Sequence, residues 1–285
     1  MPVSQVTPPS RPAPFLHDDE QLALRDEVLR FAREEAAPAE VRDEFDPALW
    51  QKMADLGLMG LPFPSELGGG GADLSTTVLA VEAFTRGGGS LSMALSWGAS
   101  TVLFGIPVSV FGTAEQKQRY LPRLASGELI GAFGLTEPGA GSDAAGLTTR
   151  AERTADGWLL NGAKMFITNG PIAGVFLVFA VTEPARGRNG ITAFLVERSA
   201  PGFTVGKPLH KMGHRASPTS ELVFENCFVG PSSVLGQEGR GFVEVAFSTL
   251  EWERSCLLGP GAGAGELMLE RAARYALSRK QFGRP

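Results

Sequence analysis

The spacing of apolar residues changes twice along the chain, and this limits the folds that the chain can adopt. Apolar residues recur at helical spacing from about residue 18 to residue 127, and the helical spacing returns from Gly241 onward. Between about residues 129 and 230, seven short runs are rich in β-branched and aromatic residues and are separated by turn residues. This order predicts an α+β protein in which helices flank an antiparallel β domain of sandwich or barrel type.

These changes of period also set the expected domain boundaries. We expect an N-terminal helical domain over residues 17–128, a middle β domain over 129–236, and the first helices of a C-terminal helical bundle over 237–285. Residues 1–16 are rich in Pro and Ser and contain no apolar core of signal-peptide length, so they are predicted to form a disordered arm.

Capping signals mark where several helices begin. Asp18 or Asp19 is a natural N-cap for the first helix, and the Asp46-Pro47 pair is typical of the start of the second. Thr113 and Gln116 have the spacing of a capping box. A glycine-rich run over 259–265, GPGAGAG, lies within a later helical pattern and has the spacing of no nucleotide-binding fingerprint.

Composition argues against several classes of protein. The chain is 43% hydrophobic and 20% charged, and its net charge of −5 is not gathered in a long block, which argues against a nucleic-acid partner. No run of about 18 apolar residues occurs, so no membrane span is expected. Cys227 and Cys256 match no zinc spacing, and His210 and His214 lack a third ligand, so no metal site is expected. Free thiols suit a reducing compartment, and we expect a cytoplasmic protein.

The run GLTEPGAGSD at 134–143 places three glycines beside Thr136, Ser142 and Asp143. One interpretation is a plain β-turn stabilised by Asp143. The other is a ligand site, because glycine lets backbone N–H groups approach an anion and the two hydroxyls add hydrogen-bonding capacity. The residues alone leave both interpretations open.

The run NGAKMFITNG at 161–170 is the second candidate for a functional segment. Asn161-Gly162 is a hairpin signal, and the following residues continue as a strand. Strand alternation puts Phe166 and Thr168 on one face, opposite Ile167. An aromatic ring and a hydroxyl on one face suit a flat heteroaromatic ligand with a polar edge, although a half-exposed strand would show the same pattern.

Together, these two runs closely resemble the acyl-CoA dehydrogenase family, in which the same two motifs follow each other around a flavin. Further matching segments are GLMGLPFPSELGGGGADL, KMGHRASPTSELVFENCFV and YALSRKQFG, so that the resemblance covers nearly all of the chain from about residue 18 to 285. The family fold has an N-terminal helical domain, a middle β domain and a C-terminal four-helix bundle. FAD lies between the middle and C-terminal domains.

The resemblance implies which residues bind FAD. Those implied at the flavin and its pyrophosphate are Phe133, Leu135, Thr136, Gly141 and Ser142. Those implied on the isoalloxazine ring are Phe166, Ile167 and Thr168, with Phe166 in place of the more usual Trp. Arg279, Gln281 and Phe282 correspond to a segment that reaches the FAD of a neighbouring subunit, which implies a homodimer or homotetramer.

The family reaction needs a carboxylate base that removes the α-proton of an acyl thioester while a β-hydride passes to the flavin. The segment LEWER aligns with the family segment that carries this base in part of the family, which selects Glu253. Glu251 lies two positions earlier on the helix, about 200° around it, so the two cannot both face one cleft. Ser142, Glu251 and Arg254 are the residues implied at the substrate.

The chain also departs from the family pattern. It ends where the family continues with further bundle helices, so we expect a truncated chain whose last helix exposes an apolar stripe that includes Leu267, Leu269 and Ala276. Pro260, with glycines on both sides, predicts a kink or break in a helix.

The resemblance implies an FAD-dependent acyl-CoA dehydrogenase of fatty acid metabolism that forms a trans-2-enoyl thioester. Its implied partners are an acyl-CoA or acyl-carrier-protein substrate and an electron-transfer flavoprotein as electron acceptor. Two alternatives stay open. One is an acyl-CoA oxidase, in which oxygen reoxidises the flavin, and the other is a truncated, non-catalytic member that binds partners or is a non-functional remnant.

Overall fold

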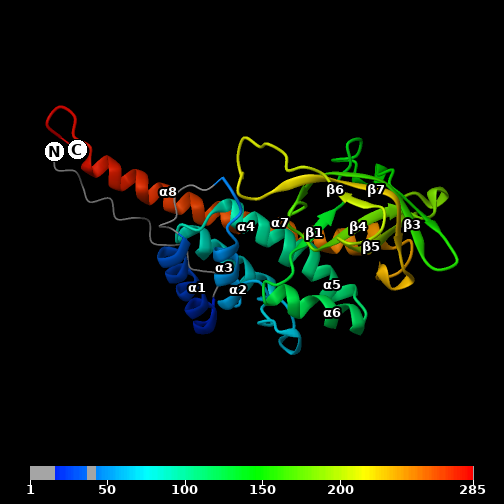
Figure 1. Ribbon diagram of the computed structural model, residues 1–285. Helices are drawn as coiled ribbons and strands as arrows, with labels where there is room; N and C mark the ends of the chain where they lie inside the picture. The colour runs from blue at the N-terminus through cyan, green and yellow to red at the C-terminus, as the bar shows by residue number, and fades with distance from the viewer. Residues whose placement is uncertain (1–16, 37–42, 285) are drawn as a thin grey trace.

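The structure is a computed structural model that describes residues 17–36 and 43–284. The predicted disordered arm, residues 1–16, lies outside the described residues. Figure 1 shows a helical region at one side and a β-sheet at the other, with a long C-terminal helical segment beside both. The α+β class and the order of helices, strands and helices are therefore confirmed.

The helical region begins where the capping signals predict. Asp18 accepts a hydrogen bond from the backbone of Gln21 and completes a capping box, and the side chain of Asp46 caps the second helix. Thr113 and Gln116 form the predicted capping box of the last helix. The α-helices of this region are α1 (Asp19–Phe31), α2 (Pro47–Asp55), α3 (Leu74–Arg86), α4 (Leu91–Trp97), α5 (Ile106–Phe111) and α6 (Ala114–Ala125).

A π-helical segment, η3 (Gly98–Gly105), joins α4 to α5 and makes one continuous apolar helix over Leu91–Phe111. Among the described residues, this is the one helix that is long and apolar enough to cross a membrane by length and composition. However, 72% of its most apolar window is buried inside the protein. Its apolar side chains therefore form part of the protein core.

The middle region forms one sheet of eight strands in the order β6-β7-β3-β2-β4-β5-β8, with β1 attached to β4. Most pairs are antiparallel, but β1 runs parallel to β4 and β2 touches β4 in parallel. The strands are β1 (Gly131–Gly134), β2 (Arg150–Arg153), β3 (Trp158–Thr168), β4 (Val175–Val181), β5 (Ile191–Glu197), β6 (Phe203–Val205), β7 (Thr219–Val229) and β8 (Val234–Leu235). The seven predicted runs each contain a strand, and β8, only two residues long, is the additional one.

The hairpin predicted at Asn161-Gly162 is wrong, because β3 continues through both residues. A register shift against β7 occurs at this point, so the pair marks a bulge in place of a turn. Gly162 has φ +145°, and a Cβ atom on it would lie 2.7 Å from Oγ1 of Thr149. The bulge and the close approach of Thr149, which directly precedes β2, explain the glycine. The turn that joins β2 to β3 instead lies at Thr154–Gly157.

Three clusters of buried side chains form the core: one between the helices and the sheet, one within the N-terminal helices and one within the sheet. The first contains Phe104, Leu121, Phe179 and Val245, which come from helices and strands alike. Cys227 and Cys256 are both buried free thiols. The helical and β regions therefore share core side chains, and this fixes the junction between them.

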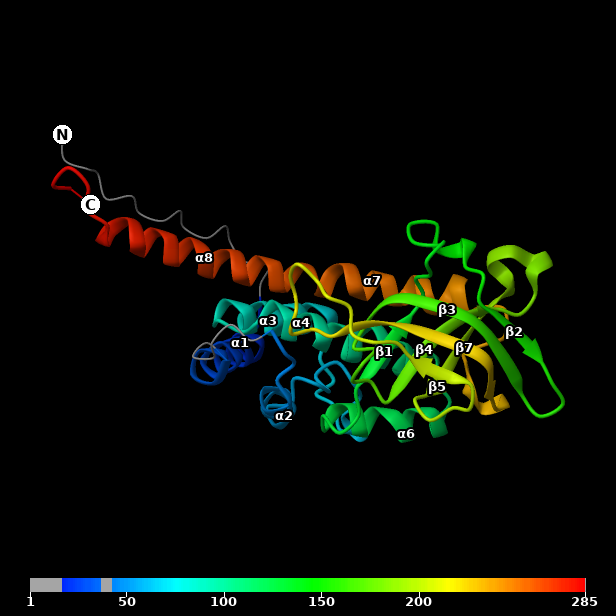
Figure 2. The ribbon, with the colours of Figure 1, turned by 45° about the horizontal axis from the view of Figure 1, so that its top comes forward.

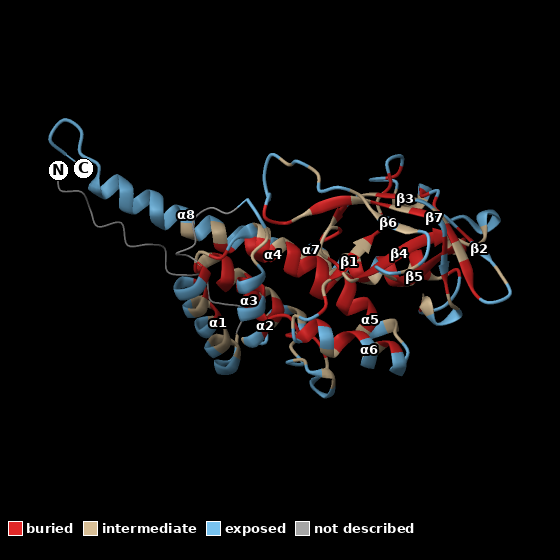
Figure 3. Ribbon diagram, viewed as in Figure 1, coloured by how far each residue is buried: buried red, intermediate tan, exposed pale blue. Residues whose placement is uncertain are grey.

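The C-terminal segment consists of a π-helical turn η7 (Gly241–Ala246), α7 (Phe247–Cys256) and α8 (Leu258–Ser278). The predicted break near Pro260 is present, because Leu257 separates α7 from α8 and Pro260 lies in the first turn of α8. Proline is tolerated there because the first turn needs no N–H donor. Beyond its contact with α3, α8 extends away from the molecule with exposed side chains, including Leu269 and Ala276, while Leu267 is half-buried (Figures 2 and 3).

Candidate functional site

A cavity of about 350 Å³ lies where η3, the sheet and α7 meet. This volume is within the range of small-molecule sites in proteins. Its lining residues come from parts of the chain that are far apart in the sequence: Ala99, Leu103, Phe133, Leu135, Thr136, Gly141, Ser142, Ala144, Phe166, Ile167, Thr168, Leu250 and Glu253. The structure thus brings together every residue assigned from the sequence to the flavin region, apart from those at 279–282.

The glycine-rich loop faces open space at the cavity. Glu137 and Ala140 exchange backbone hydrogen bonds, so a tight turn is indeed present. However, a Cβ atom added to Gly139 or Gly141 would meet no atom within 4 Å. Packing within the chain therefore does not require glycine at either position, and bare backbone borders an open volume that a ligand could fill.

The end of β3 departs from regular alternation. A second register shift occurs between Lys164 and Ile167, and Phe166 has φ +60°, a conformation that aromatic residues rarely adopt. The predicted arrangement of Phe166 and Thr168 opposite Ile167 is therefore modified, since all three border the cavity. Phe166 is 66% exposed. Strained backbone that holds an apolar ring at a cavity indicates a functional constraint.

A buried ion pair joins the loop to the strand. Nζ of Lys164 lies 2.7 Å from Oε1 of Glu137 and also donates to the carbonyl of Leu135. Glu137 further accepts hydrogen bonds from the backbone and hydroxyl groups of Thr148 and Thr149. Burial opposes the charge of Glu137, but the nearby Lys164 and these donors lower the pKa of that carboxyl below its ordinary value. The two motifs are therefore held together by a fully hydrogen-bonded charge pair.

Asn169 anchors the same end of β3 to the rest of the site. It is fully buried, has φ +64°, and its side-chain amide donates to the carbonyls of Ser96 and Gly131. Glu137, Lys164 and Asn169 were not predicted from the sequence as site-forming residues. All three stand inside the two motifs, but a charged or amide residue in such a run usually lies at the surface, so only its partner reveals its role.

Glu253 reaches the cavity from α7 and is half-buried. Burial raises the pKa of its carboxyl, while the positive charge of Arg254 acts to lower it. A raised pKa in a cavity is typical of carboxylates that exchange protons. Glu251 and Arg254 are exposed and are not among the residues that line the cavity.

The remaining predicted site residues lie elsewhere. Arg279, Gln281 and Phe282 follow the last turn of α8 and are exposed, and Phe282 is 95% exposed. They follow the distal end of α8, which extends away from the sheet (Figure 2), and none of them lines the cavity. Within residues 17–36 and 43–284, no group of three or more His, Cys, Asp or Glu side chains could hold a metal ion.

Comparison with known proteins gives a consistent result. The family model of the acyl-CoA dehydrogenase N-terminal domain matches residues 18–128, and that of the middle domain matches residues 132–227. An acyl-CoA dehydrogenase of Bacillus subtilis (strain 168) is 45% identical over 270 residues, which are 93% of this chain and 70% of that protein.

Solved structures show the same fold. Butyryl-CoA dehydrogenase from Megasphaera elsdenii superposes with a TM-score of 0.89 at 38% identity, over 95% of this chain and 72% of that one. A structure described as PigA with FAD and proline gives a TM-score of 0.90 at 34% identity, over 95% of this chain and 72% of that one. Fold and matched sequences define a flavoprotein oxidoreductase. The chain belongs to the acyl-CoA dehydrogenase family.

Proposed function

We propose that the chain binds FAD with its isoalloxazine ring at the cavity of about 350 Å³ and oxidises an acyl thioester to its trans-2-enoyl product. One observation carries this proposal: the glycine-rich loop, the end of β3 and the Glu253 carboxylate border a single cavity. A flavin dehydrogenase needs these three parts together, namely bare backbone and hydroxyls for the cofactor, a flat apolar surface for its ring, and a base beside the reacting carbon.

The cavity residues fit a flavin. The open space beside Gly141 admits a ligand against the main chain. The hydroxyls of Thr136, Ser142 and Thr168 border the cavity, and none of them hydrogen-bonds to a side chain or backbone group in the described part of the chain. They are therefore available for the polar edge and side arm of the cofactor, while the exposed Phe166 ring offers an apolar face.

Glu253 is proposed to remove the α-proton of the thioester. Bound FAD would supply the acceptor for the β-hydride. Because burial raises the pKa of Glu253, its carboxylate binds a proton more readily than an exposed one and is better matched to a carbon acid. Leu250 and Leu103 line the same cavity and would exclude water from the reacting carbons.

The substrate arm is proposed to pass Ser142. Arg254 and Glu251, which lie outside the cavity lining, would contact only the outer part of a bound substrate. We propose that Arg254 also limits the rise in the pKa of Glu253, since its positive charge opposes the effect of burial. Arg279, Gln281 and Phe282 are proposed to reach the FAD of a second copy, which would make the active unit a homodimer or homotetramer.

Flavin content and flavin absorbance test the proposal. Purified protein is expected to be yellow, with about one FAD per chain, and its flavin absorbance is expected to decrease when an acyl-CoA is added without oxygen. Protein that stays colourless with added FAD would support the non-catalytic alternative. Protein that binds FAD but is not reduced by acyl-CoA or acyl-carrier-protein thioesters of any length would contradict the proposed reaction.

We propose a cytoplasmic enzyme of fatty acid metabolism whose electrons pass to an electron-transfer flavoprotein. The rate of flavin reoxidation in air distinguishes an oxidase from a dehydrogenase, because the substrate-reduced flavin of an oxidase is reoxidised rapidly by oxygen. Stopped-flow mixing of reduced protein with air-saturated buffer, and separately with oxidised electron-transfer flavoprotein, measures both rates. Faster reoxidation by oxygen would replace the dehydrogenase with the oxidase.

A further inference from the structure

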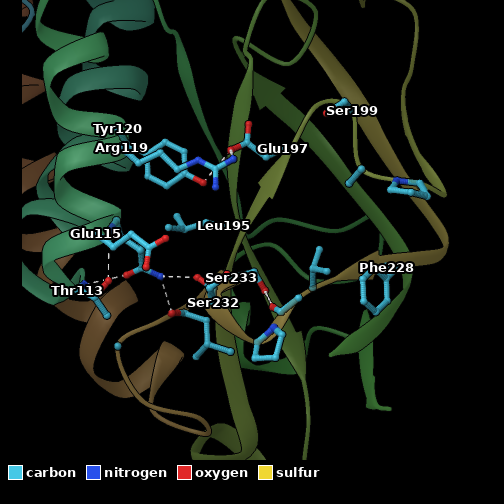
Figure 4. A pocket seen from close by; sticks show the side chains of 18 residues that line it. Thr113, Glu115, Arg119, Tyr120, Leu195, Glu197, Ser199, Phe228, Ser232 and Ser233 are labelled. Carbon is cyan, nitrogen blue, oxygen red and sulfur yellow. Dashed lines mark hydrogen bonds and ion pairs between the residues drawn. The ribbon is translucent and has the colours of Figure 1, made fainter. Parts of the chain in front are cut away.

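A second cavity, of about 520 Å³, lies between α6 and the sheet and shares no lining residue with the candidate flavin cavity. Three walls form it: the first half of α6, the end of β5 with the turn after it, and the segment that joins β7 to β8 (Figure 4). The buried side chain of Gln116 fixes two of these walls, since it donates to the carbonyls of Ser232 and Val234 at 2.9 Å each. The cavity is therefore preformed.

Glu197 is held rigidly on one side of this cavity. The phenol of Tyr120, which is only 5% exposed, donates to Oε1 of Glu197 at 2.8 Å. Nη2 of Arg119 lies 2.9 Å from the same oxygen, and its guanidinium lies 5.4 Å from the centroid of the Tyr120 ring. The Tyr120 hydrogen bond and the Arg119 ion-pair contact are both at Oε1, and no hydrogen bond to Oε2 comes from the described residues. One carboxylate oxygen thus remains available to a ligand.

The charges around the cavity favour a cation. Its charged lining residues are Glu115, Arg119 and Glu197, so carboxylates outnumber cations. Arg119 is already engaged by Glu197, and Glu115 is exposed at the same wall (Figure 4). The two carboxylates and the one guanidinium leave one negative charge uncompensated. This charge would attract a positively charged ligand.

An apolar surface faces these carboxylates. Phe228 is 38% exposed on the wall opposite Glu197, and Pro201 and Pro231 also line the cavity with exposed side chains. An alkyl or aromatic group can bury area against these side chains while a charged end remains at the carboxylates. A metal ion or an inorganic cation would leave this apolar surface unused.

We propose that this cavity binds a small organic ammonium ion with an apolar body. Its ammonium group donates to Oε2 of Glu197 and lies near Glu115, and its apolar part packs on Phe228 and the two prolines. The site is independent of the proposed flavin chemistry, and it connects α6 to the sheet. An occupant would bridge the helical and β regions of the molecule.

Phenethylamine and its neutral analogue 2-phenylethanol form a matched pair of probes for calorimetry on the full chain. We expect the amine to bind at least about tenfold more tightly than the alcohol, because a charged hydrogen bond contributes more than a neutral one. The affinity for the amine is expected to fall when salt is raised, since screening weakens charge attraction. Equal affinities, or no binding of either probe, would overturn the proposal.

Variants that remove a negative or a positive charge test whether the site prefers a cation. Glu197→Gln is expected to weaken amine binding about tenfold, whereas Arg119→Gln, which removes the only cation of the lining, is expected to strengthen it about threefold. Glu152→Gln, at an exposed position on β2, is the control and is expected to change nothing. If Glu197→Gln unfolds the chain, the Arg119→Gln result alone decides, because weaker or unchanged amine binding there contradicts a cation site.

Discussion

Glu253 differs from Glu251, the other acidic residue of α7, because it borders the candidate flavin cavity. If it is the base, Glu253→Gln removes the proton acceptor and keeps nearly the same shape. We expect FAD to remain bound and the rate of flavin reduction by acyl-CoA to fall by about 10²–10⁴-fold. Stopped-flow absorbance measures this rate. Glu152→Gln is the matched control, and a Glu253→Gln protein that is reduced at the normal rate contradicts the assignment.

The pH dependence of the same reaction follows from the raised pKa of Glu253. A protonated carboxyl cannot accept the α-proton, so the reduction rate is expected to fall as pH is lowered through that pKa. Because burial raises the pKa, this fall occurs at a higher pH than the ordinary value of 4.5. Arg254→Gln removes a charge that lowers the pKa and is expected to move the fall to still higher pH.

The Glu137–Lys164 pair is expected to control the stability of the site. Either Glu137→Gln or Lys164→Met leaves one buried charge without its partner, which costs about 3–5 kcal/mol of the free energy of unfolding. The double variant removes both charges and is expected to cost much less than the two single changes together. Urea unfolding of the four proteins measures this difference. Additive effects would mean that the pair is not coupled.

The pH dependence of the unfolding free energy is a second test of this pair. The folded-state pKa of Glu137 lies below its ordinary value of 4.5, so its stabilising contribution is complete above that value. The contribution is lost as pH falls through the lowered folded-state pKa. The unfolding free energy of the natural protein is therefore expected to decrease below about pH 4.5 more steeply than that of the double variant.

At the residue scale, the two motifs and Glu253 could be recognised in the sequence, but the contacts that hold them in place could not. Glu137 and Lys164 are separated by 27 residues, and nothing in either run alone predicts a buried pair. The hairpin prediction at Asn161-Gly162 was wrong because Gly162 lies at a bulge against β7 and packs closely on Thr149, in place of a turn. Such contacts depend on which segments meet, and local spacing does not encode this.

At the scale of elements, Gly263 and Gly265 of α8 have different surroundings, although both belong to the same glycine-rich run. A Cβ atom on Gly263 would lie 2.1 Å from the carbonyl oxygen of Glu82 on α3, whereas one on Gly265 would meet nothing within 4 Å. Thr85 of α3 also donates to the carbonyl of Pro260 at 2.9 Å. The glycine-rich run thus lets α8 approach α3 closely, so its glycine content has a packing role.

This difference gives a matched pair of substitutions. Gly263→Ala forces α3 and α8 apart and is expected to destabilise the chain by about 1–3 kcal/mol. Gly265→Ala changes only helix propensity and is expected to stabilise it by up to about 1 kcal/mol. Thermal unfolding measures both. Equal effects of the two substitutions would show that close packing of α8 on α3 does not require Gly263.

Most elements could be predicted from the sequence because their signals are local. Caps at Asp18, Asp46 and Thr113 begin helices through contacts within four residues. The two-residue strand β8 and the parallel pairing of β1 with β4 could not be predicted in this way. Each depends on a partner strand far away in the chain, and short strands carry too few residues to show a period.

At the scale of the whole molecule, the candidate flavin cavity lies where η3, the sheet and α7 meet. A ligand that binds there stabilises the folded arrangement of all three against unfolding. At FAD concentrations of about 100 times the dissociation constant, the expected gain is about 2.7 kcal/mol. For a chain of this size, this corresponds to a rise in Tm of about 5–10 °C.

Gly141→Val separates ligand binding from folding in this experiment. Since a Cβ atom on Gly141 meets nothing within 4 Å, the variant is expected to fold with an unchanged Tm in the absence of FAD. The added side chain then occupies the space that the cofactor needs, so the rise in Tm with FAD should disappear. Scanning calorimetry measures the Tm with FAD and, as the control ligand, with ADP. If Gly141→Val keeps the full FAD-dependent rise, the flavin does not lie against this loop, and the cavity has another occupant.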